Sequence, residues 1–133
     1  MANNDKFRVG IKNLMTKTKE KTEIFVKQLV DEIDSELVLR SPVDTGRFKA
    51  NWIVGNGSIN TEKFERFSDI SHAPLIQSIK VNGQIIYITN SLPYAYRLEY
   101  QSWSKQAPAG MTRITVAGIN SKANKIGLAL RAF

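Results

Sequence analysis

The first 41 residues contain no proline, and this unbroken run constrains the fold more than any other feature of the chain. Proline removes a hydrogen bond from a helix interior, so a segment of this length without it favours a single long helix. Asn3, Asn4 or Asp5 can cap its start. Pro42 ends it, because the residue before a proline resists the helical region. We therefore expect a helix over residues 1–40.

The second half of this helix has an apolar face. Its residues recur at steps of three and four along the chain: Val26, Leu29, Val30, Ile33 and Leu37, with Phe25 at the edge. Residues 16–23, TKTKEKTE, are good helix formers without an apolar face. A long helix with a polar middle either projects from the core or lies against another subunit.

The segment that follows has strand and turn patterns. Residues 47–55 alternate, with Phe48, Ala50 and Trp52 on one side, which is typical of a half-buried strand. Residues 55–69 are polar and contain glycine, which favours a mobile loop or an irregular connection.

Further along, Pro74 suits the first turn of a short helix over 74–80. VNGQ, at 81–84, is a hairpin-type turn signal, and the β-branched residues of 84–90 favour a strand. Residues 93–100 fit another short helix. In the tail, an apolar seam predicts one helix over 108–133: Val116, Ile119, Ala123, Ile126 and Leu130.

These patterns predict an α+β fold with a long N-terminal helix, a small antiparallel β-sheet and a C-terminal helix. With 133 residues and 15.0 kDa, the chain is long enough for one domain with a modest core. We expect a single domain over 1–133, made of the helix 1–40, a sheet with loops and short helices over 41–107, and the helix 108–133.

Composition narrows the chemistry that this chain can carry. It has no cysteine and one histidine, His72, which excludes disulfides, thiolate chemistry and zinc sites built on cysteine or several histidines. No P-loop, dinucleotide fingerprint or carboxylate cluster with metal spacing is present. No apolar run approaches the roughly 18 residues that a bilayer requires, and the N-terminus lacks the apolar block of a signal peptide. We expect no metal, no cofactor and no membrane partner, and synthesis in the cytoplasm.

The triplet Asp44–Thr45–Gly46 invites comparison with aspartic proteases, in which two aspartates share a proton. Single-chain enzymes of that class are far longer and carry the motif twice, whereas the retroviral type pairs its motifs by dimerisation. There the triplet follows an apolar strand, but here it follows a helix and a proline. We therefore interpret the segment as a structural turn, formed by Pro42, Asp44, Thr45, Gly46 and Arg47.

A second catalytic hypothesis makes His72 a general base, with Asp69 or Glu99 as its orienting partner. His72 lies in a stretch that we expect to be a loop, without a nucleophile motif beside it. A surface or helix-capping role fits better, and we expect the chain not to be an enzyme.

An aromatic cluster in the second half is the strongest candidate for a binding surface. Such residues can stack single-stranded bases, or they can form the centre of a protein–protein interface or a corner of the core. We favour a protein interface, with Trp52 as a core anchor and Glu99 as an interface or folding residue. The cluster consists of Tyr94, Tyr96, Tyr100 and Trp103, interleaved with Arg97 and Lys105.

The formal net charge is +7, and the excess is concentrated in the tail. Residues 101–133 contain no acid and five cations: Lys105, Arg113, Lys122, Lys125 and Arg131. These cations can face DNA or an acidic protein. Alternatively they form a solvated helix surface, with cations favoured near its C-terminal end, and this second interpretation is the simpler one.

Three segments, SPVDTGRFKANW, YITNSLPYAYRLEY and WSKQAPAGM, resemble a family of small virion proteins of tailed phages. These are the neck or tail-completion proteins of lambda-like phages, also called head–tail joining or tail-component proteins. The motif resemblance covers residues 40–117. It rests on Pro42, Asp44, Thr45, Gly46, Arg47, Asn51, Trp52, Asn90, Pro93, Tyr94, Ala95, Leu98, Glu99, Tyr100, Ala107, Pro108, Gly110 and Met111. One departure is Gln101, where the family has glycine, so a left-handed backbone there would cost about 1–2 kcal/mol.

The resemblance implies a structural protein of the virion neck that catalyses nothing. It implies a homo-oligomeric ring, sixfold or twelvefold, around the DNA channel, made in the cytoplasm of the host bacterium. Its partners would be the phage connector or adaptor and the tail tube or terminator proteins, with non-specific contact to channel DNA. Two alternatives remain open, a tail-terminator protein that caps the tail tube and a basic nucleic-acid-binding protein.

Overall fold

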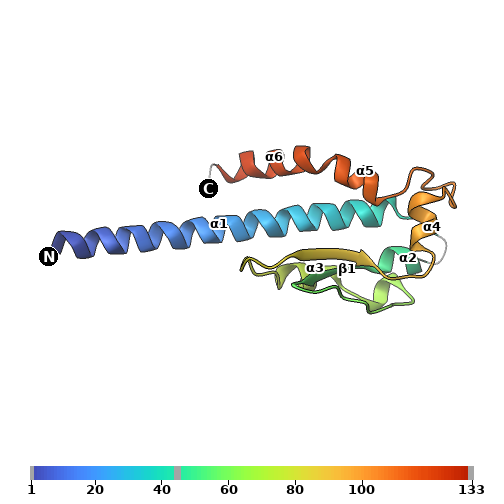
Figure 1. Ribbon diagram of the computed structural model, residues 1–133, viewed down its shortest axis with the longest axis horizontal. Helices are drawn as coiled ribbons and strands as arrows, with labels where there is room; N and C mark the ends of the chain where they lie inside the picture. The colour runs from blue at the N-terminus through green and yellow to red at the C-terminus, as the bar shows by residue number, and fades with distance from the viewer. Residues whose placement is uncertain (1, 44–45, 132–133) are drawn as a thin grey trace.

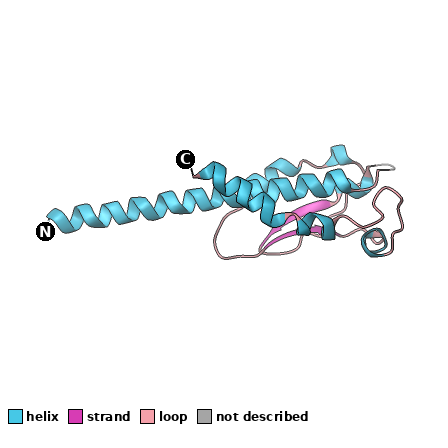
Figure 2. Ribbon diagram, turned by 90° about the horizontal axis from the view of Figure 1, so that it is seen from above, coloured by secondary structure: helices cyan, strands magenta, loops and turns pink. Residues whose placement is uncertain are grey.

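The computed structural model describes residues 2–43 and 46–131. The fold is α+β, built around helix α1 (Ala2–Arg40). α1 lies between two layers, with the C-terminal helices on one side and a two-stranded sheet with helix α3 (His72–Gln77) on the other (Figure 1). Its N-terminal part extends beyond every other element in both views (Figures 1 and 2). As expected, the long helix ends before Pro42.

The sheet pairs β1 (Trp52–Asn56) with β2 (Ile86–Asn90) in antiparallel register, Trp52 opposite Asn90 and Asn56 opposite Ile86. The prediction of a strand beginning at residue 47 is wrong, because Arg47–Ala50 form a helical turn, α2. Gly46 has a φ of 81°, and its carbonyl accepts a hydrogen bond from the Ala50 amide at 3.2 Å. This bond winds the chain into one turn before β1 begins.

The VNGQ segment turns the chain without forming a hairpin. Gly83 has a φ of 82°, and the Asn82 side chain accepts a hydrogen bond from the Gln84 amide at 3.2 Å. The turn lies between α3 and β2, whose partner β1 comes earlier in the chain. A short irregular connection with one 3₁₀ turn, η1 (Phe67–Asp69), separates β1 from α3.

The C-terminal segment contains two helices where the sequence predicts one. These are α5 (Thr112–Ala117) and α6 (Ile119–Leu130), which meet at Gly118. Ile126 of the predicted seam is 4% exposed, but Val116 is 56% exposed, so the seam does not continue through the break. The segment begins its helix at Thr112, because the residues just before it are held by Glu99 of helix α4 (Ala95–Tyr100).

Two buried clusters hold the layers together. One packs α1 against α3 and the sheet through Val30, Val54, Ile76 and Ile79. The other lies at the end of α1 where α2, α4 and the 101–111 loop meet, and consists of Leu37, Phe48, Trp52, Leu92, Leu98, Ala107 and Met111. Within the described residues, no helix is both long and apolar enough to span a bilayer.

Candidate functional site

The second cluster anchors a row of aromatic rings that leads from the core to the surface. Trp52 is 6% exposed, and its indole N–H donates to the Ser41 hydroxyl at 2.7 Å. Phe48 meets the Trp52 ring edge-on at 5.7 Å between centroids and the Tyr94 ring at 5.9 Å. Tyr94 in turn lies 6.0 Å from the ring of Trp103, which is 57% exposed. Packing of this kind fixes the outer ring on the folded body.

Around Trp103 lies an exposed surface that we name the aromatic–arginine platform: Tyr96, Arg97, Tyr100, Trp103 and Arg113. The Tyr96 and Tyr100 rings are 4.9 Å apart and are 63% and 56% exposed. The Arg97 guanidinium lies 5.7 Å from the centre of the Trp103 ring, and that of Arg113 lies 5.0 Å from Tyr100. Exposed tyrosine, tryptophan and arginine held in fixed positions are the residues that contribute most to protein interfaces.

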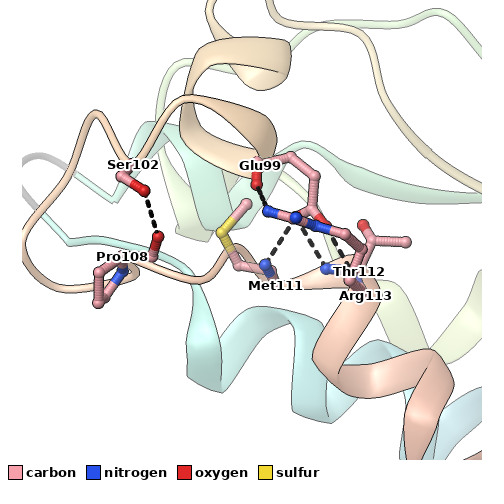
Figure 3. A network of polar contacts seen from close by, with 6 residues as sticks. All are labelled: Glu99, Ser102, Pro108, Met111, Thr112 and Arg113. Atoms are coloured by element: carbon pink, nitrogen blue, oxygen red, sulfur yellow. Dashed lines mark hydrogen bonds and ion pairs between the residues drawn. The ribbon is translucent and has the colours of Figure 1, made fainter.

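Glu99 supports the platform from beneath. This side chain is 6% exposed, and its carboxylate accepts hydrogen bonds from three backbone amides at the start of α5 (Figure 3). The distances are 2.6 Å to Met111 N, 2.9 Å to Thr112 N and 2.8 Å to Arg113 N. The Arg113 guanidinium also bonds the Glu99 carboxylate and its backbone carbonyl. We call this arrangement the Glu99 clamp.

The clamp determines the charge of Glu99. Burial by itself raises the pKa of the carboxyl group, but the three amides and the Arg113 guanidinium outweigh burial and lower the pKa below its usual value. Glu99 is therefore ionised at neutral pH, with its oxygens occupied by the protein itself. That environment suits a structural cap and not an acid catalyst.

The loop between α4 and α5 is closed at its base. The Ser102 hydroxyl donates to the Pro108 carbonyl at 2.6 Å (Figure 3). The left-handed residue of this turn is Ser102, with a φ of 49°, whereas Gln101 has a φ of −113°. The strain anticipated at Gln101 is therefore absent at that residue. Gly110 has a φ of 84°, and a Cβ atom there would lie 2.6 Å from the Glu99 carbonyl oxygen.

The same loop is tied to the segment after α1. The Gln106 side chain accepts from the Val43 amide at 2.9 Å and donates to the Val43 carbonyl at 3.2 Å. An open hollow of about 640 Å³ lies between the two segments. It brings together predicted residues from opposite halves of the chain: Pro42, Gly46, Arg47, Tyr94, Trp103 and Lys105. Asp44 and Thr45, the remaining residues of the predicted turn, lie outside the described residues.

Two of the five predicted DNA-facing cations form ion pairs within the chain. Arg113 belongs to the clamp, and Lys122 forms an ion pair with Glu36 of α1. The pair with Lys122 lowers the pKa of Glu36 against the opposing effect of burial, and a second pair with Arg40 lowers it further. Arg113 and Lys122 therefore have structural partners within the chain.

The other three cations are exposed. Lys105 borders the hollow, Lys125 lies on α6, and Arg131 directly follows the last residue of α6. Contact of these cations with DNA stays a prediction.

His72 has a different partner from either acid that the catalytic hypothesis names. Its Nδ1 lies 2.7 Å from a carboxylate oxygen of Asp34, which is 3% exposed on α1. Glu99 is held in the clamp, and the Asp69 side chain lies outside the described part of the chain. Hydrogen bonding to Asp34 raises the pKa of His72, against the opposing effect of burial. The pair joins α3 to α1, and no cluster of ligands for a metal ion occurs among the described residues.

Two asparagines of the motifs, Asn51 and Asn90, form hydrogen bonds that the sequence does not reveal. Asn51 bonds the Arg47 and Phe64 carbonyls, both at 2.7 Å, and Asn90 bonds the Phe48 carbonyl at 2.9 Å. These side chains pin α2 between the sheet and the irregular connection. Their partners are up to 42 residues away along the chain, so no local spacing could identify them.

Comparison of the chain with models of protein families, with curated proteins and with solved structures gave no match.

Proposed function

We propose that this chain is a structural protein of a tailed-phage virion, located at the head–tail junction, where it joins the connector to the tail around the DNA channel. It assembles into a ring with copies of itself, binds the connector or adaptor on one side and the tail tube or terminator on the other, and catalyses no reaction. It needs no metal and no cofactor.

One observation carries the proposal. The three motifs that resemble the neck family are separated in sequence, but their residues meet at one end of the molecule around the aromatic–arginine platform. Most of the motif residues that the structure describes there have a structural role. Gly46 starts a turn, Asn90 pins α2, Glu99 caps α5 and Gly110 permits the clamp. The motifs thus specify a rigid interaction surface, which supports an assembly role over a catalytic one.

The proposal is tested by locating the protein. Purified particles of a phage that carries this gene are analysed by quantitative mass spectrometry and by immunogold labelling. The proposal predicts several copies per particle with label at the neck. Label on isolated tails, at the end that joins the head, with none on isolated heads would transfer the protein to the tail-terminator role, and a monomer absent from the particle would contradict both.

The second candidate is binding of nucleic acid, and the platform is the observation that favours it. Exposed aromatic rings beside Arg97 and Lys105 can stack on single-stranded bases. A gel shift that is strong at physiological ionic strength and weakens steeply with added salt would support this candidate. Ring formation that is insensitive to DNA supports the virion role instead.

A further inference from the structure

The N-terminal arm, residues 6–21 of α1, presents apolar side chains that no other part of the described chain covers. Val9, Ile11, Leu14 and Met15 are 43% to 67% exposed. Ile11, Leu14 and Met15 fall on one side of the helix, because they are three and four positions apart. The arm projects past every other element (Figure 1).

This apolar side continues an interface that is already formed within the chain. A spacing of three and four links Ile11 and Met15 to Thr18, Thr22 and then Phe25. Phe25 lies against Gly127 of α6, where a Cβ atom would be 4.0 Å from the ring. The Thr18 and Thr22 hydroxyls donate to carbonyls of their own helix at 2.9 Å, so each is already paired when this face is buried. The arm therefore has the composition of a covered helix face.

The charge of the arm indicates which kind of surface covers its apolar side. The arm carries six cations and one acid: Lys6, Arg8, Lys12, Lys17, Lys19 and Lys21 against Glu20. Two arms side by side would bring like charges together, which opposes pairing of the arms with each other. The arm needs a partner surface that combines acids with exposed apolar groups.

The opposite half of α1 is such a surface. Residues 28–39 contain four acids and no cation. Asp34 is paired with His72 and Glu36 with Arg40 and Lys122, but Asp31 and Glu32 have no ion-pair partner among the described residues.

Beside these acids lies a shallow hollow of about 340 Å³. Leu39 is 84% exposed and Phe67 is 41% exposed at its border, next to Asp31 and Ser35. We name this surface the acidic groove, after the exposed Asp31 and the buried Asp34 in its lining. Its other lining residues are Ser35, Val38, Leu39, Phe67 and His72. One cation borders it, since the Lys49 ammonium lies 4.8 Å from the centre of the Phe67 ring.

We propose that the N-terminal arm of one copy of this chain docks in the acidic groove of a neighbouring copy. The arm cannot reach its own groove, because Leu14 and Ser35 lie about 31 Å apart on one continuous helix at about 1.5 Å per residue. Arm and groove are different surfaces, so each copy offers one donor and one acceptor. Such a head-to-tail contact closes into a ring when the rotation per subunit allows it. The inference rests on the proposed function, since it names the surface through which ring subunits join.

The absence of cysteine makes a direct test possible. Full-length Leu14→Cys and Ser35→Cys variants are mixed, oxidised and run on a non-reducing gel. A disulfide requires Cα atoms within about 7 Å, and docking raises the local concentration of the two thiols. We expect about tenfold more linked dimer from this mixture than from Leu14→Cys mixed with Ser121→Cys, a matched control on the exposed side of α6. The double variant Leu14→Cys/Ser35→Cys should give a ladder of higher oligomers.

A charge-reversal pair provides a second, independent readout. Lys12→Glu/Lys19→Glu lowers the formal charge of the arm from +5 to +1, and Asp31→Lys/Ser35→Lys changes that of residues 28–39 from −4 to −1. Each variant should therefore weaken self-association in sedimentation. An equimolar mixture should recover it, because the native arm of one variant then meets the native groove of the other, and the introduced carboxylates meet the introduced lysines. Equal yields with the Ser121→Cys control, preferential Leu14–Leu14 linkage, or no recovery on mixing would overturn the inference.

A result against the arm–groove contact can be distinguished from a result against the proposed virion role. If the protein is found at the neck but gives no arm–groove cross-link, the arm–groove contact is contradicted and the virion role stands. If the protein gives cross-linked rings but is absent from the particle, the arm–groove contact stands and the virion role is contradicted.

Discussion

At Glu99 one carboxylate accepts hydrogen bonds from the first backbone amides of α5 and thereby joins two helices and the loop between them. Hydrogen bonds to a charged acceptor are stronger than neutral ones, and these are buried. The sequence identifies Glu99 as an acid among tyrosines, but it gives no sign of the amides more than ten residues later. Glu99 could therefore be singled out from the sequence as an interface or folding residue, but the amides that it binds could not.

Replacing Glu99 by Gln should lower the free energy of unfolding by about 2 kcal/mol, because a neutral amide accepts these bonds more weakly. Urea denaturation measures the change, and Glu62→Gln on the exposed connection should have almost no effect. Folding lowers the pKa of Glu99, so its stabilisation is present above about pH 4.5 and is lost as pH falls through the folded pKa. A difference between wild type and Glu99→Gln that persists at low pH would contradict the clamp.

Two glycines with the same backbone conformation provide a matched pair. Gly110→Ala should cost at least about 2 kcal/mol, because the new Cβ would lie 2.6 Å from the Glu99 carbonyl oxygen in addition to the left-handed strain. Gly83 has a φ of 82° with open space around it, so Gly83→Ala should cost only the conformational term, about 1 kcal/mol. Equal losses in chemical denaturation would show that the close approach at Gly110 does not exist.

The chain contains one histidine, so its titration can be assigned without ambiguity. NMR should give a pKa for His72 above the ordinary 6.5, and Asp34→Asn should return it toward that value. A raised pKa means that the stabilisation is complete below about pH 6.5 and is lost as pH rises through the folded pKa. Unfolding free energy should therefore fall as the pH rises above about 6.5 in the wild type and not in His72→Gln. A pKa at or below 6.5 would contradict the pair.

At the scale of elements, the long α1 could be predicted because it depends on a local signal, the absence of proline before residue 42. The prediction of a strand at residues 47–50 is wrong, because an alternating pattern over four residues also fits a single helical turn. Gly46 and its bond to Ala50 decide that choice. The sequence predicts a continuous C-terminal helix, because one glycine weakens a helix by only about 1 kcal/mol relative to alanine, but Gly118 separates α5 from α6.

Deleting residues 1–20 should leave the folded body intact. Residues 8–20 are all exposed, so the free energy of unfolding should change by no more than about 0.5 kcal/mol. Ile79→Ala, at a side chain with 0% exposure, should by comparison cost about 3 kcal/mol. Circular dichroism should show loss of helix in proportion to the residues removed. A body that unfolds upon deletion would mean that the arm packs on its own chain.

On the scale of the whole molecule, α1 connects two regions with different roles. One end carries the aromatic–arginine platform on a rigid base, and the other end carries a basic arm whose apolar residues stay exposed in its own chain (Figure 1). The exposed residues of both ends were visible in the sequence as residue types. The sequence does not reveal that the two ends are separated along one helix, because this separation depends on which residues pack against α1.

Substitutions at the two tryptophans distinguish a residue of the proposed interface from a residue of the core. Trp103→Ala, at an exposed ring, should change the free energy of unfolding by less than about 1 kcal/mol and should abolish joining of heads to tails. Trp52→Ala, at a buried ring, should cost about 3–5 kcal/mol. Full joining activity in folded Trp103→Ala would remove the platform from the proposed interface.

The most direct test of the virion role is an assembly measurement. The gene is deleted from a phage that carries it, lysates are viewed by negative-stain microscopy, and purified protein is then added back. The proposed role requires that separate full heads and tails accumulate without the protein and join upon addition of the wild-type protein. Intact virions in the absence of the protein would contradict that role.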